Sequence, residues 1–464
     1  MDLSWVSQVF GQTFPSTLTL TGVCIDSRQV QPGHLFVALL GERFDGHDFV
    51  EEALHHGAVA VLASKPLPNI SVPVILVLDT FLALRQLAHA YRKICAIKTI
   101  ALTGSNGKTS VKEMISCILP SPAFSSRGNL NNHIGVPLSI LQVRPEDRYA
   151  VFELGANHIG EIAQNAELVA PQVVLVNNIG PAHIGEFGSI EGVACAKGEI
   201  YQALSAEGIA VVNDDDAYAH FWDSIIQEKA GVWRFSVAAP TEEARAGEKR
   251  VYASKVSLNE HGCVRFILHL PDGSQSPIQL QVTGLHMLSN ALAAASATAA
   301  LGISSDLIVQ GLQTFTGVAG RLTLLPGKNG SILIDDSYNA NLASTLAALA
   351  VLAHRPGKRI FVFGDMGELG EWTQEHHEVV GRTAREYNIE GLMTCGTHSK
   401  FASAAFGVGA THFATQAELV TAITLLLDAN TSVLLKGSRS SRIEHITQQL
   451  MVVSEAADAV SSLH

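Results

Sequence analysis

The chain has 464 residues, of which 47% are hydrophobic and 16% are charged, and its formal net charge is −12. This length exceeds that of one ordinary domain and predicts two or three domains with large cores. The acidic balance argues against nonspecific nucleic-acid binding, and because every apolar run is shorter than eighteen residues, we expect no membrane span.

The cysteines and the first residues indicate the compartment. The six cysteines are scattered and form no Cys-x-x-Cys pair, which argues against both a structural zinc site and a disulfide framework. The segment Met1-Asp2-Leu3-Ser4-Trp5 lacks the basic start and apolar core of a signal peptide. We therefore expect a cytoplasmic protein.

Residues 1–85 predict a small α/β domain. Apolar runs indicate strands over 35–39 and 59–62, with a helix over 49–56 between them. A further helical stretch over 82–93 leads into the next domain.

Residues 86–315 predict a central domain in which apolar strands alternate with helices. Such alternation is typical of a mostly parallel sheet with helices on both faces, and the strands are expected over 97–102, 149–152, 173–176 and 208–212. The apolar period then changes to two around the turn Pro271-Asp272-Gly273, which predicts an antiparallel hairpin of residues 264–268 and 278–282. An alanine-rich helix over 290–301 follows.

Residues 316–464 predict a third domain that repeats the strand-then-helix pattern. Its strands are expected over 332–334, 359–363, 392–395 and 432–435. We therefore predict an α/β protein of three domains, with a P-loop-type, mostly parallel sheet in the centre and a Rossmann-like C-terminal domain.

A glycine-rich loop follows the first strand of the central domain. The sequence Thr103-Gly104-Ser105-Asn106-Gly107-Lys108-Thr109-Ser110 stands between that strand and a helix whose apolar residues recur from Val111 to Leu119. In this context glycines let backbone N–H groups close on phosphate oxygens, and the helix N-terminus adds a favourable dipole. We expect residues 104–110 to bind a nucleoside triphosphate, with Lys108 at the outer phosphates and Thr109 on Mg²⁺. The usual first glycine of a P-loop is replaced by Leu102.

Two polar residues follow neighbouring strands of the same predicted sheet. Glu153 ends the strand over 149–152, a position that suits a Mg²⁺ ligand beside a P-loop. The alternative is a solvated strand end. His183 follows the strand over 173–176. A histidine in a loop is more often a surface residue, and it gains weight only because it shares a sheet edge with Lys108 and Glu153.

Lys197 lies on the apolar face of a helix predicted over 189–204. A buried lysine is costly unless it is paired or neutral, and burial lowers its pKa. A neutral amine can react with CO₂ to give a carbamate, which is an anionic metal ligand. The alternative is a lysine whose head reaches solvent, and the residues alone favour that alternative.

Charged residues in the third domain could reach a ligand of the second. Arg321 stands near its start, Asp336 closes the strand over 332–334, and Lys436 closes the strand over 432–435. Such groups could clamp a phosphate or a carboxylate when two domains close. For any one of them, ordinary surface charge is the simpler interpretation.

Taken together, these motifs resemble the Mur ligase family of ATP-dependent amide-bond-forming enzymes over essentially the whole chain. The resemblance rests on the P-loop, in which the family also lacks the first glycine, and on Glu153, His183, Ala196-Lys197-Gly198-Glu199, Gly284-x-His286-x-x-x-Asn290, Gly320-Arg321 and Asp336. Within the family, residues 128–137, 334–341, 364–370 and 436–439 are most similar to members that add a D-alanyl-D-alanine dipeptide. An Asp-Asn-Pro-Arg stretch, expected of the diaminopimelate-adding members, does not occur in the sequence.

The first domain also carries family motifs. Asp26-Ser27-Arg28 and Phe44-Asp45-Gly46-His47-Asp48-Phe49 resemble the UDP-sugar-binding domain of the later Mur ligases. Leu342 and His133 depart from the family pattern, and neither falls on an ATP or metal position.

The resemblance implies a role for each candidate residue. Lys108, His183, Lys197 and Arg321 would be catalytic. ATP would contact Gly104, Ser105, Asn106, Gly107, Lys108, Thr109 and Ser110, with Asn290 at the adenine, Asp336 at the ribose and Arg321 at the γ-phosphate. Two Mg²⁺ ions would be held by Thr109, Glu153, His183 and carbamylated Lys197. The other substrates would contact Ser27, Arg28, Asn131, Asn132, Asn339, Lys436 and Ser438.

The implied reaction joins D-alanyl-D-alanine to a UDP-N-acetylmuramoyl-tripeptide during peptidoglycan synthesis. The tripeptide carboxylate would attack the γ-phosphate to give an acyl phosphate, which the dipeptide amine would then attack to form the amide. The resemblance also implies a monomer with a role in cell-wall biogenesis, cell shape and cell division. The open alternatives are another Mur-type ligase, a folylpolyglutamate-synthetase-like enzyme (which should lack the UDP-sugar domain), a P-loop NTPase switch and a noncatalytic scaffold.

Overall fold

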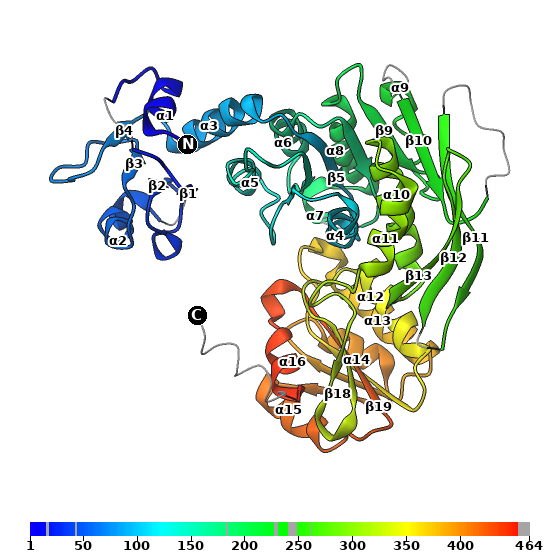
Figure 1. The fold of residues 1–464 in the computed structure, drawn as a ribbon. Coiled ribbons are helices and arrows are strands. Elements are labelled where there is room, and N and C mark those ends of the chain that lie inside the picture. The colour runs from blue at the N-terminus through cyan, green and yellow to red at the C-terminus, as the bar shows by residue number, and fades with distance from the viewer. Residues whose placement is uncertain are drawn as a thin grey trace.

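The computed structural model describes residues 1–14, 18–41, 44–181, 184–226, 231–239, 248–260 and 262–452. Three β-sheets follow one another along the chain, and helices pack on each of them (Figure 1). Most neighbouring strands within the sheets are parallel. The predicted α/β class with mostly parallel sheets is therefore confirmed. We call the units around the three sheets the N-terminal, central and C-terminal lobes.

The N-terminal lobe contains a four-stranded parallel sheet in the order β1-β2-β3-β4. Its strands are β1 (Gly22–Cys24), β2 (His34–Val37), β3 (Ala60–Ala63) and β4 (Val74–Leu76). Apolar residues of α1 (Leu3–Val9) and α3 (Thr80–Ile94) belong to one core cluster of this sheet, and those of α2 (Val50–His55) belong to another.

Helix α3 is shared between the N-terminal and central lobes. The side chain of Asp79 accepts hydrogen bonds from the backbone N–H groups of Phe81 and Leu82, which caps the start of the helix. Its buried residues Leu84 and Leu87 belong to a single apolar cluster that includes residues of both lobes. One continuous helix and one continuous core therefore join the two lobes.

The central lobe contains a nine-stranded sheet in the order β13-β12-β11-β10-β9-β8-β5-β7-β6. Its strands are β5 (Lys98–Thr103), β6 (Ala123–Ser125), β7 (Tyr149–Glu153), β8 (Val173–Val176), β9 (Ile209–Asn213), β10 (Gly231–Ser236), β11 (Glu248–Leu258), β12 (Cys263–His269) and β13 (Gln275–Thr283). The predicted hairpin is the antiparallel pair of β12 and β13. It forms the far edge of the main sheet, because β10 and β11, which were not predicted, connect it to β9.

Helices cover both faces of the central sheet. Along β5, Ile100 and Leu102 face one cluster and Ala101 faces the other, as the alternation of a strand requires. The first cluster includes α4 (Lys108–Ile118), α10 (His286–Ala300) and α11 (Ser305–Thr314). The second includes α3, α5 (Gly135–Ile140), α6 (Glu161–Val169), α7 (Ile184–Phe187), α8 (Ile190–Gln202) and α9 (Asp223–Ile226).

The C-terminal lobe contains a six-stranded sheet in the order β14-β15-β19-β16-β17-β18, parallel except for the pair β14 and β15. The strands are β14 (Thr323–Pro326), β15 (Ile332–Asp336), β16 (Lys358–Phe363), β17 (Gly391–Cys395), β18 (Ala410–Phe413) and β19 (Thr431–Lys436). One core cluster contains α12 (Leu342–Ala353), α13 (Thr373–Glu386) and α14 (Lys400–Phe406). The other contains α15 (Gln416–Thr424) and α16 (Glu444–Leu450).

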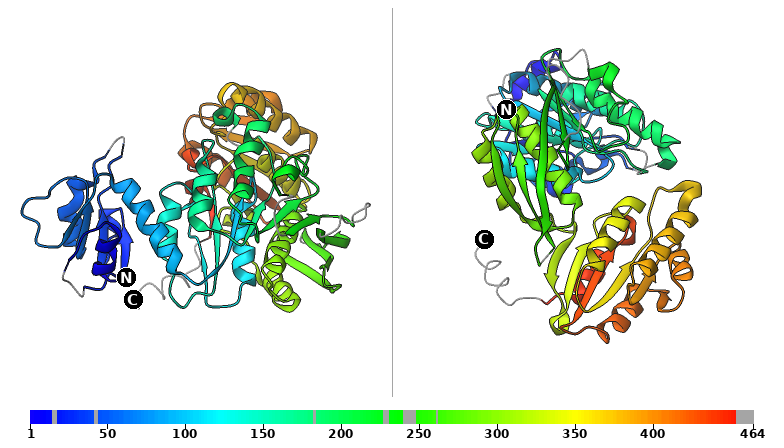
Figure 2. Two further views of the ribbon diagram at one scale, coloured as in Figure 1. Left: turned by 90° about the horizontal axis from the view of Figure 1, so that it is seen from above. Right: turned by 90° about the vertical axis from the view of Figure 1, so that its right-hand side faces the viewer.

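The N-terminal and C-terminal lobes attach separately to the central lobe. Figures 1 and 2 show the blue N-terminal sheet and the orange C-terminal sheet apart from each other in every view. Within the described ranges, every helix is too short or too polar to cross a lipid bilayer.

Candidate active site

A cavity of about 630 Å³ lies between the central and C-terminal lobes. It is lined by the loop after β5, the ends of β7, β15 and β19, and the start of α10. Carboxyl ends of parallel strands are where ligand sites gather in open α/β sheets. The predicted site residues that line it are Ser105, Asn106, Gly107, Lys108, Ser110, Asn131, Asn132, Glu153, Lys197, Asn290, Arg321, Asp336, Asn339 and Lys436.

Strand β5, the glycine loop and helix α4 follow one another in the order that the sequence predicts. Gly107 has a φ of 76°, and a Cβ atom there would lie 2.4 Å from Oδ1 of Asn290. Only glycine fits this position. Helix α4 begins at Lys108, whose Nζ donates to the carbonyl of Gly104 at 2.7 Å. Removal from water lowers the pKa of Lys108, an effect that nearby Glu153 opposes and Arg321 reinforces.

Residues after β8 brace this loop. The backbone N–H of Ser105 donates to the carbonyl of Asn178 at 2.9 Å, and that of Asn106 donates to the Asn178 side chain at 2.8 Å. The next residue, Ile179, donates its N–H to Asp216 at 2.7 Å. Neither Asn178 nor Asp216 was predicted as a site residue, although both follow predicted strands at the edge that carries the P-loop.

Oxygen donors meet beside the P-loop. The hydroxyl of Thr109 donates to Oε2 of Glu153 at 2.8 Å, and the amide of Asn131 donates to Oε1 at 2.8 Å. A hydroxyl and a carboxylate in contact are the oxygen ligands that Mg²⁺ prefers. Within the part of the chain that the structure describes, no three His, Cys, Asp or Glu side chains are placed so that together they could hold a metal ion. His183 lies outside the described residues.

Lys197 is buried on α8, with 2% of its surface exposed, and it lines the cavity. Burial, together with the nearby charge of Lys108, lowers its pKa to about 7. The ammonium group makes no hydrogen bond or ion pair with a residue in the described ranges. The alternative of a side chain extended to solvent is therefore wrong. This lysine is available in its neutral form near neutral pH.

Asp336 and Lys436 form an ion pair in the cavity wall. Nζ of Lys436 lies 2.5 Å from Oδ2 of Asp336 and also donates to the carbonyl of Asn339 at 2.9 Å. Burial raises the pKa of Asp336, and the Lys436 charge opposes that rise. Two residues that the resemblance assigned to different ligands are therefore partners of each other.

Arg321 reaches the P-loop from the C-terminal lobe. Its Nη2 donates to the hydroxyl of Thr109 at 3.0 Å, and its guanidinium lies 4.4 Å from the ring centre of Tyr338. Stacking on an aromatic face restricts the arginine to one orientation. The predicted reach across two domains is thus present in this structure.

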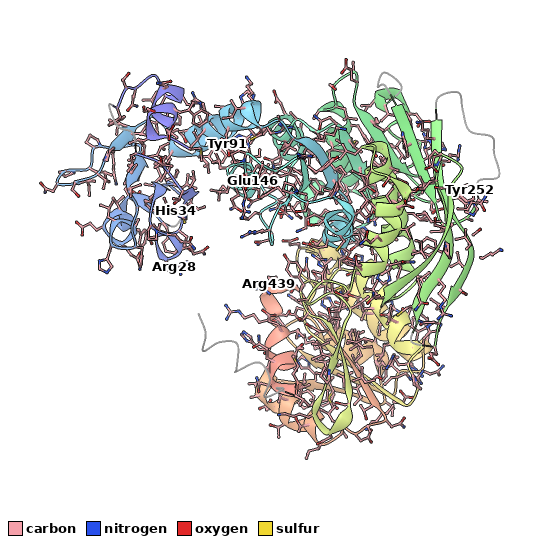
Figure 3. The ribbon with its side chains drawn as sticks, viewed as in Figure 1. Arg28, His34, Tyr91, Glu146, Tyr252 and Arg439 are labelled. Atoms are coloured by element: carbon pink, nitrogen blue, oxygen red, sulfur yellow. The ribbon has the colours of Figure 1, made fainter. Side chains whose placement is uncertain are left out.

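Five predicted residues within the described ranges are absent from the cavity lining. Gly104 and Thr109 belong to the P-loop, where Thr109 contacts the lining residues Glu153 and Arg321, and the other three lie elsewhere. Ser27 donates to Glu52 at 2.5 Å, and Arg28, whose side chain is 78% exposed, pairs with Asp26 at 2.8 Å. Figure 3 places Arg28 on the N-terminal lobe, apart from Arg439 on the C-terminal lobe. Ser438 is buried among other serines, 3.1 Å from the hydroxyl of Ser441.

His286 is a cavity residue to which no role was assigned in advance. It begins α10, and burial together with the charge of Lys436 lowers its pKa to about 4. The imidazole is therefore neutral at physiological pH. In the sequence, His286 could have been found as a site residue from the motif Gly284-x-His286-x-x-x-Asn290.

Family models match all three lobes. "Mur ligase family, catalytic domain" matches residues 19–92, "Mur ligase middle domain" matches 102–298, and "Mur ligase, glutamate ligase domain" matches 320–439.

Relatives match almost the whole length of the chain. The UDP-N-acetylmuramoyl-tripeptide–D-alanyl-D-alanine ligase of Escherichia coli (strain K12) is 43% identical over 95% of this chain and 96% of its own. A crystal structure of MurF from Acinetobacter baumannii is 35% identical and aligns with a TM-score of 0.86 over 97% of this chain and 98% of its own. The MurF ligase of Thermotoga maritima in complex with ADP is 26% identical and aligns at 0.78 over 93% and 97%.

Proposed function

The chain belongs to the Mur ligase family, and we propose that it is the ATP-dependent ligase that joins D-alanyl-D-alanine to a UDP-N-acetylmuramoyl-tripeptide. The products are UDP-N-acetylmuramoyl-pentapeptide, ADP and phosphate. One observation carries the proposal: the P-loop, the Thr109–Glu153 pair and Arg321 of the C-terminal lobe meet at one cavity. This arrangement suits phosphoryl transfer to a carboxylate.

Each lobe has its own task in this proposal. Residues 1–85 bind the UDP-sugar, with Ser27 and Arg28 among the contacts. Residues 86–315 bind ATP through residues 104–110 and Asn290. Residues 316–464 bind the incoming dipeptide, with Asn339, Lys436 and Ser438 among the contacts, while Asn131 and Asn132 face the tripeptide from the central lobe. Asp336 binds the ribose, oriented by its ion pair with Lys436.

Two magnesium ions fit the donor set at the cavity. Thr109 and Glu153 offer oxygen atoms in contact with each other, and the neutral amine of Lys197 can take up CO₂ to become a carbamate. His183 is the remaining proposed ligand. When bound, the ions supply positive charge that offsets the anionic phosphates and carboxylate.

In the proposed reaction a carboxylate must approach a polyphosphate, and the two anions repel each other. Two cationic side chains of the protein can offset this repulsion. Lys108 lies in the P-loop, and Arg321 approaches from the facing lobe. Placed at the γ-phosphate, both stabilise the charge that develops during transfer. The cavity between the lobes limits the access of water to the acyl phosphate, which would otherwise be hydrolysed. The dipeptide amine then attacks the acyl carbon, phosphate leaves and the amide forms.

A cellular setting is part of the proposal. The enzyme acts in the cytoplasm as a monomer, in peptidoglycan synthesis, and so contributes to cell-wall biogenesis, cell shape, the cell cycle and cell division.

The first test is phosphate release from ATP and Mg²⁺ with UDP-N-acetylmuramoyl-tripeptide, in the presence and absence of D-alanyl-D-alanine. Single amino acids serve as control acceptors. We expect release that requires the dipeptide. Release with a single amino acid would instead indicate another Mur-type ligase, and release that needs neither acceptor nor tripeptide would indicate an NTPase switch.

A further inference from the structure

A second hydrogen bond joins the C-terminal lobe to the P-loop, at a distance from Arg321 along the sequence. Nδ2 of Asn341, at the start of α12, donates to Oδ1 of Asn106 at 2.8 Å. Both residues line the cavity. The proposed roles of the site residues make no use of this contact.

The orientation of the Asn341 amide is fixed by its own helix. Oδ1 of Asn341 accepts from the N–H of Ser344 at 2.9 Å, and the hydroxyl of Ser344 accepts from the N–H of Asn341 at 3.2 Å. This reciprocal pair is a capping box. Because the cap requires an oxygen facing Ser344, the NH₂ group of the amide must face the other way, toward Asn106.

Asn106 is held equally firmly from the central lobe. Its backbone N–H donates to Asn178, and its carbonyl accepts from the amides of Asn177 at 2.9 Å and Asn178 at 3.1 Å. The backbone of Asn106 is therefore fully engaged with the loop after β8. Its side chain is the part that extends from the P-loop toward the C-terminal lobe.

Two contacts at different points of the P-loop constrain orientation as well as distance. Arg321 meets the loop at Thr109, and Asn341 meets it at Asn106. One hydrogen bond would allow the lobes to rotate about it in any direction, whereas a second, separated bond leaves only rotation about the line that joins the two bonds. Both partners in the Asn341–Asn106 bond are themselves held by further hydrogen bonds, so this contact favours the relative orientation of the two lobes seen in the structure.

We propose that Asn341 is a positioning residue, which acts through Asn106 to set the angle of the C-terminal lobe on the P-loop. The proposal rests on the ligase function above. It assigns Asn341 no contact with the reacting atoms. Its effect is to place Arg321 and the dipeptide-binding residues in register with the γ-phosphate.

The substitution Asn341→Ser removes the hydrogen bond to Asn106 (the bridge between the lobes) and keeps the cap of α12. Serine is as good an N-cap as asparagine, but its side chain is too short to reach Asn106. We expect the dipeptide-dependent kcat to fall by about five-fold, in line with the loss of one hydrogen bond, while ATP binding at equilibrium changes by less than about two-fold. Asn106→Ala should cause at least a similar fall, because Asn106 is also among the proposed ATP contacts. The double variant should be no worse than Asn106→Ala alone, because that variant has already lost the bond.

A cap elsewhere in the C-terminal lobe gives the matched control. Thr415 forms the capping box of α15 with Glu418, and neither residue lines the cavity. Thr415→Ala should lower the midpoint of thermal unfolding and leave kcat unchanged. Asn341→Ser should leave the midpoint unchanged and lower kcat. The proposal would be wrong if the falls in kcat of the two single variants multiplied in the double variant. It would also be wrong if Asn341→Ser left kcat unchanged.

The role of Asn341 can also be tested by a measurement that does not depend on catalysis, and therefore not on the proposed function. Small-angle X-ray scattering in the presence of a non-hydrolysable ATP analogue should give a larger radius of gyration for Asn341→Ser than for the unaltered chain. If the unaltered chain showed no ligase activity, the function would be wrong and the scattering would still decide whether the bridge orients the lobe. Equal radii would count against the bridge whatever the activity.

Discussion

Lys197 shows how much a single side chain depends on its surroundings. The apolar face of α8 holds the amine out of water, and the charge of Lys108 further disfavours protonation, so the pKa is lowered to about 7. The sequence placed Lys197 on an apolar face but favoured escape of its amine to solvent, and that prediction was wrong. The choice between burial and escape depended on the residues packed around α8, which come from segments distant in the sequence.

The carbamate at Lys197 can be tested directly. Incubation with carbon-13 bicarbonate should give a carbamate resonance that Lys197→Ala and Lys197→Arg both lack, because arginine keeps its charge. The resonance should weaken as the pH falls from 8 to 6, since protonation below a pKa of about 7 removes the reactive amine. Activity should fall by at least about 10²-fold in both variants.

Lys112 is a useful internal comparison for that experiment. It is equally buried, but it pairs with Glu113 at 2.7 Å and donates to the carbonyl of Ser126 at 2.6 Å. It should contribute no signal, so a resonance that survives in Lys197→Ala would refute the assignment. Full activity in either Lys197 variant would refute the proposed role.

Arg321 should matter to turnover more than to nucleotide binding. Arg321→Ala removes the contact with Thr109 and a cation at the proposed γ-phosphate position. We expect kcat to fall by about 10²-fold, with ATP affinity, measured by titration calorimetry, changed by less than about three-fold. Equal losses in affinity and turnover would indicate a structural role.

His286 should make stability sensitive to mild acid. Its pKa is about 4 in the folded chain, below its ordinary value, so between these values the unfolded chain binds more protons. The free energy of unfolding should therefore decrease as the pH falls from about 6.5 to 4. His286→Gln should flatten that dependence, measured by urea unfolding at several pH values. An unchanged slope would show that other histidines, such as the buried His377, are responsible.

At the scale of helices and strands, α8 carries its lysine in a tightly packed setting. A Cβ atom at Gly198 would lie 2.1 Å from Nε1 of Trp222, which itself donates to the carbonyl of Ala194 at 3.1 Å. Glycine at 198 therefore allows the segment around α9 to pack directly against α8.

Gly198→Ala should disturb this packing, even though alanine favours helices. We expect the free energy of unfolding to fall by about 1–3 kcal/mol, the usual effect of overpacking, as measured by urea denaturation. Cys195→Ala changes an exposed residue of the same helix and should have little effect. If Gly198→Ala were as stable as the unaltered chain, the close packing of Trp222 would be irrelevant to stability.

Uninterrupted apolar strands were the easiest elements to predict. The strands around 97–102, 149–152 and 173–176 lie within one or two residues of their predicted bounds, because strands buried on both faces read as continuous apolar runs. Strands β10 and β11 were missed. Charged residues such as Arg234 interrupt them, and Arg234 is buried because it pairs with Asp214 and Asp223. Pairing of this kind, between segments apart in the sequence, leaves no local pattern.

The site was predictable to a similar extent. Residues in local motifs, such as Lys108 and Glu153, lie at the cavity as expected. The Asp336–Lys436 ion pair and the bracing by Asp216 were not foreseen, because each joins residues from different strands. Contacts between side chains of different strands have no sequence signal beyond the presence of a polar residue at a strand end.

The arrangement of the three lobes concentrates freedom of movement in one place. The N-terminal and central lobes share the core around α3, whereas the C-terminal lobe meets the central lobe across a cavity. Closure around substrates should therefore involve the C-terminal lobe, about the chain between α11 and β14.

The length of helix α3 also sets the distance between the N-terminal lobe and the P-loop. Its fifteen residues span about 22 Å, so it sets the length that an elongated substrate must have if it is held by the N-terminal lobe and reacts at the P-loop. Seven residues inserted in its middle would add about 10 Å and keep the apolar face nearly in phase. We expect such a chain to bind ATP normally and to lose its affinity for the tripeptide substrate, measured by calorimetry with each ligand. Unaltered affinity for both would mean that length is not selected here, and a longer substrate that bound the lengthened chain better would show that it is.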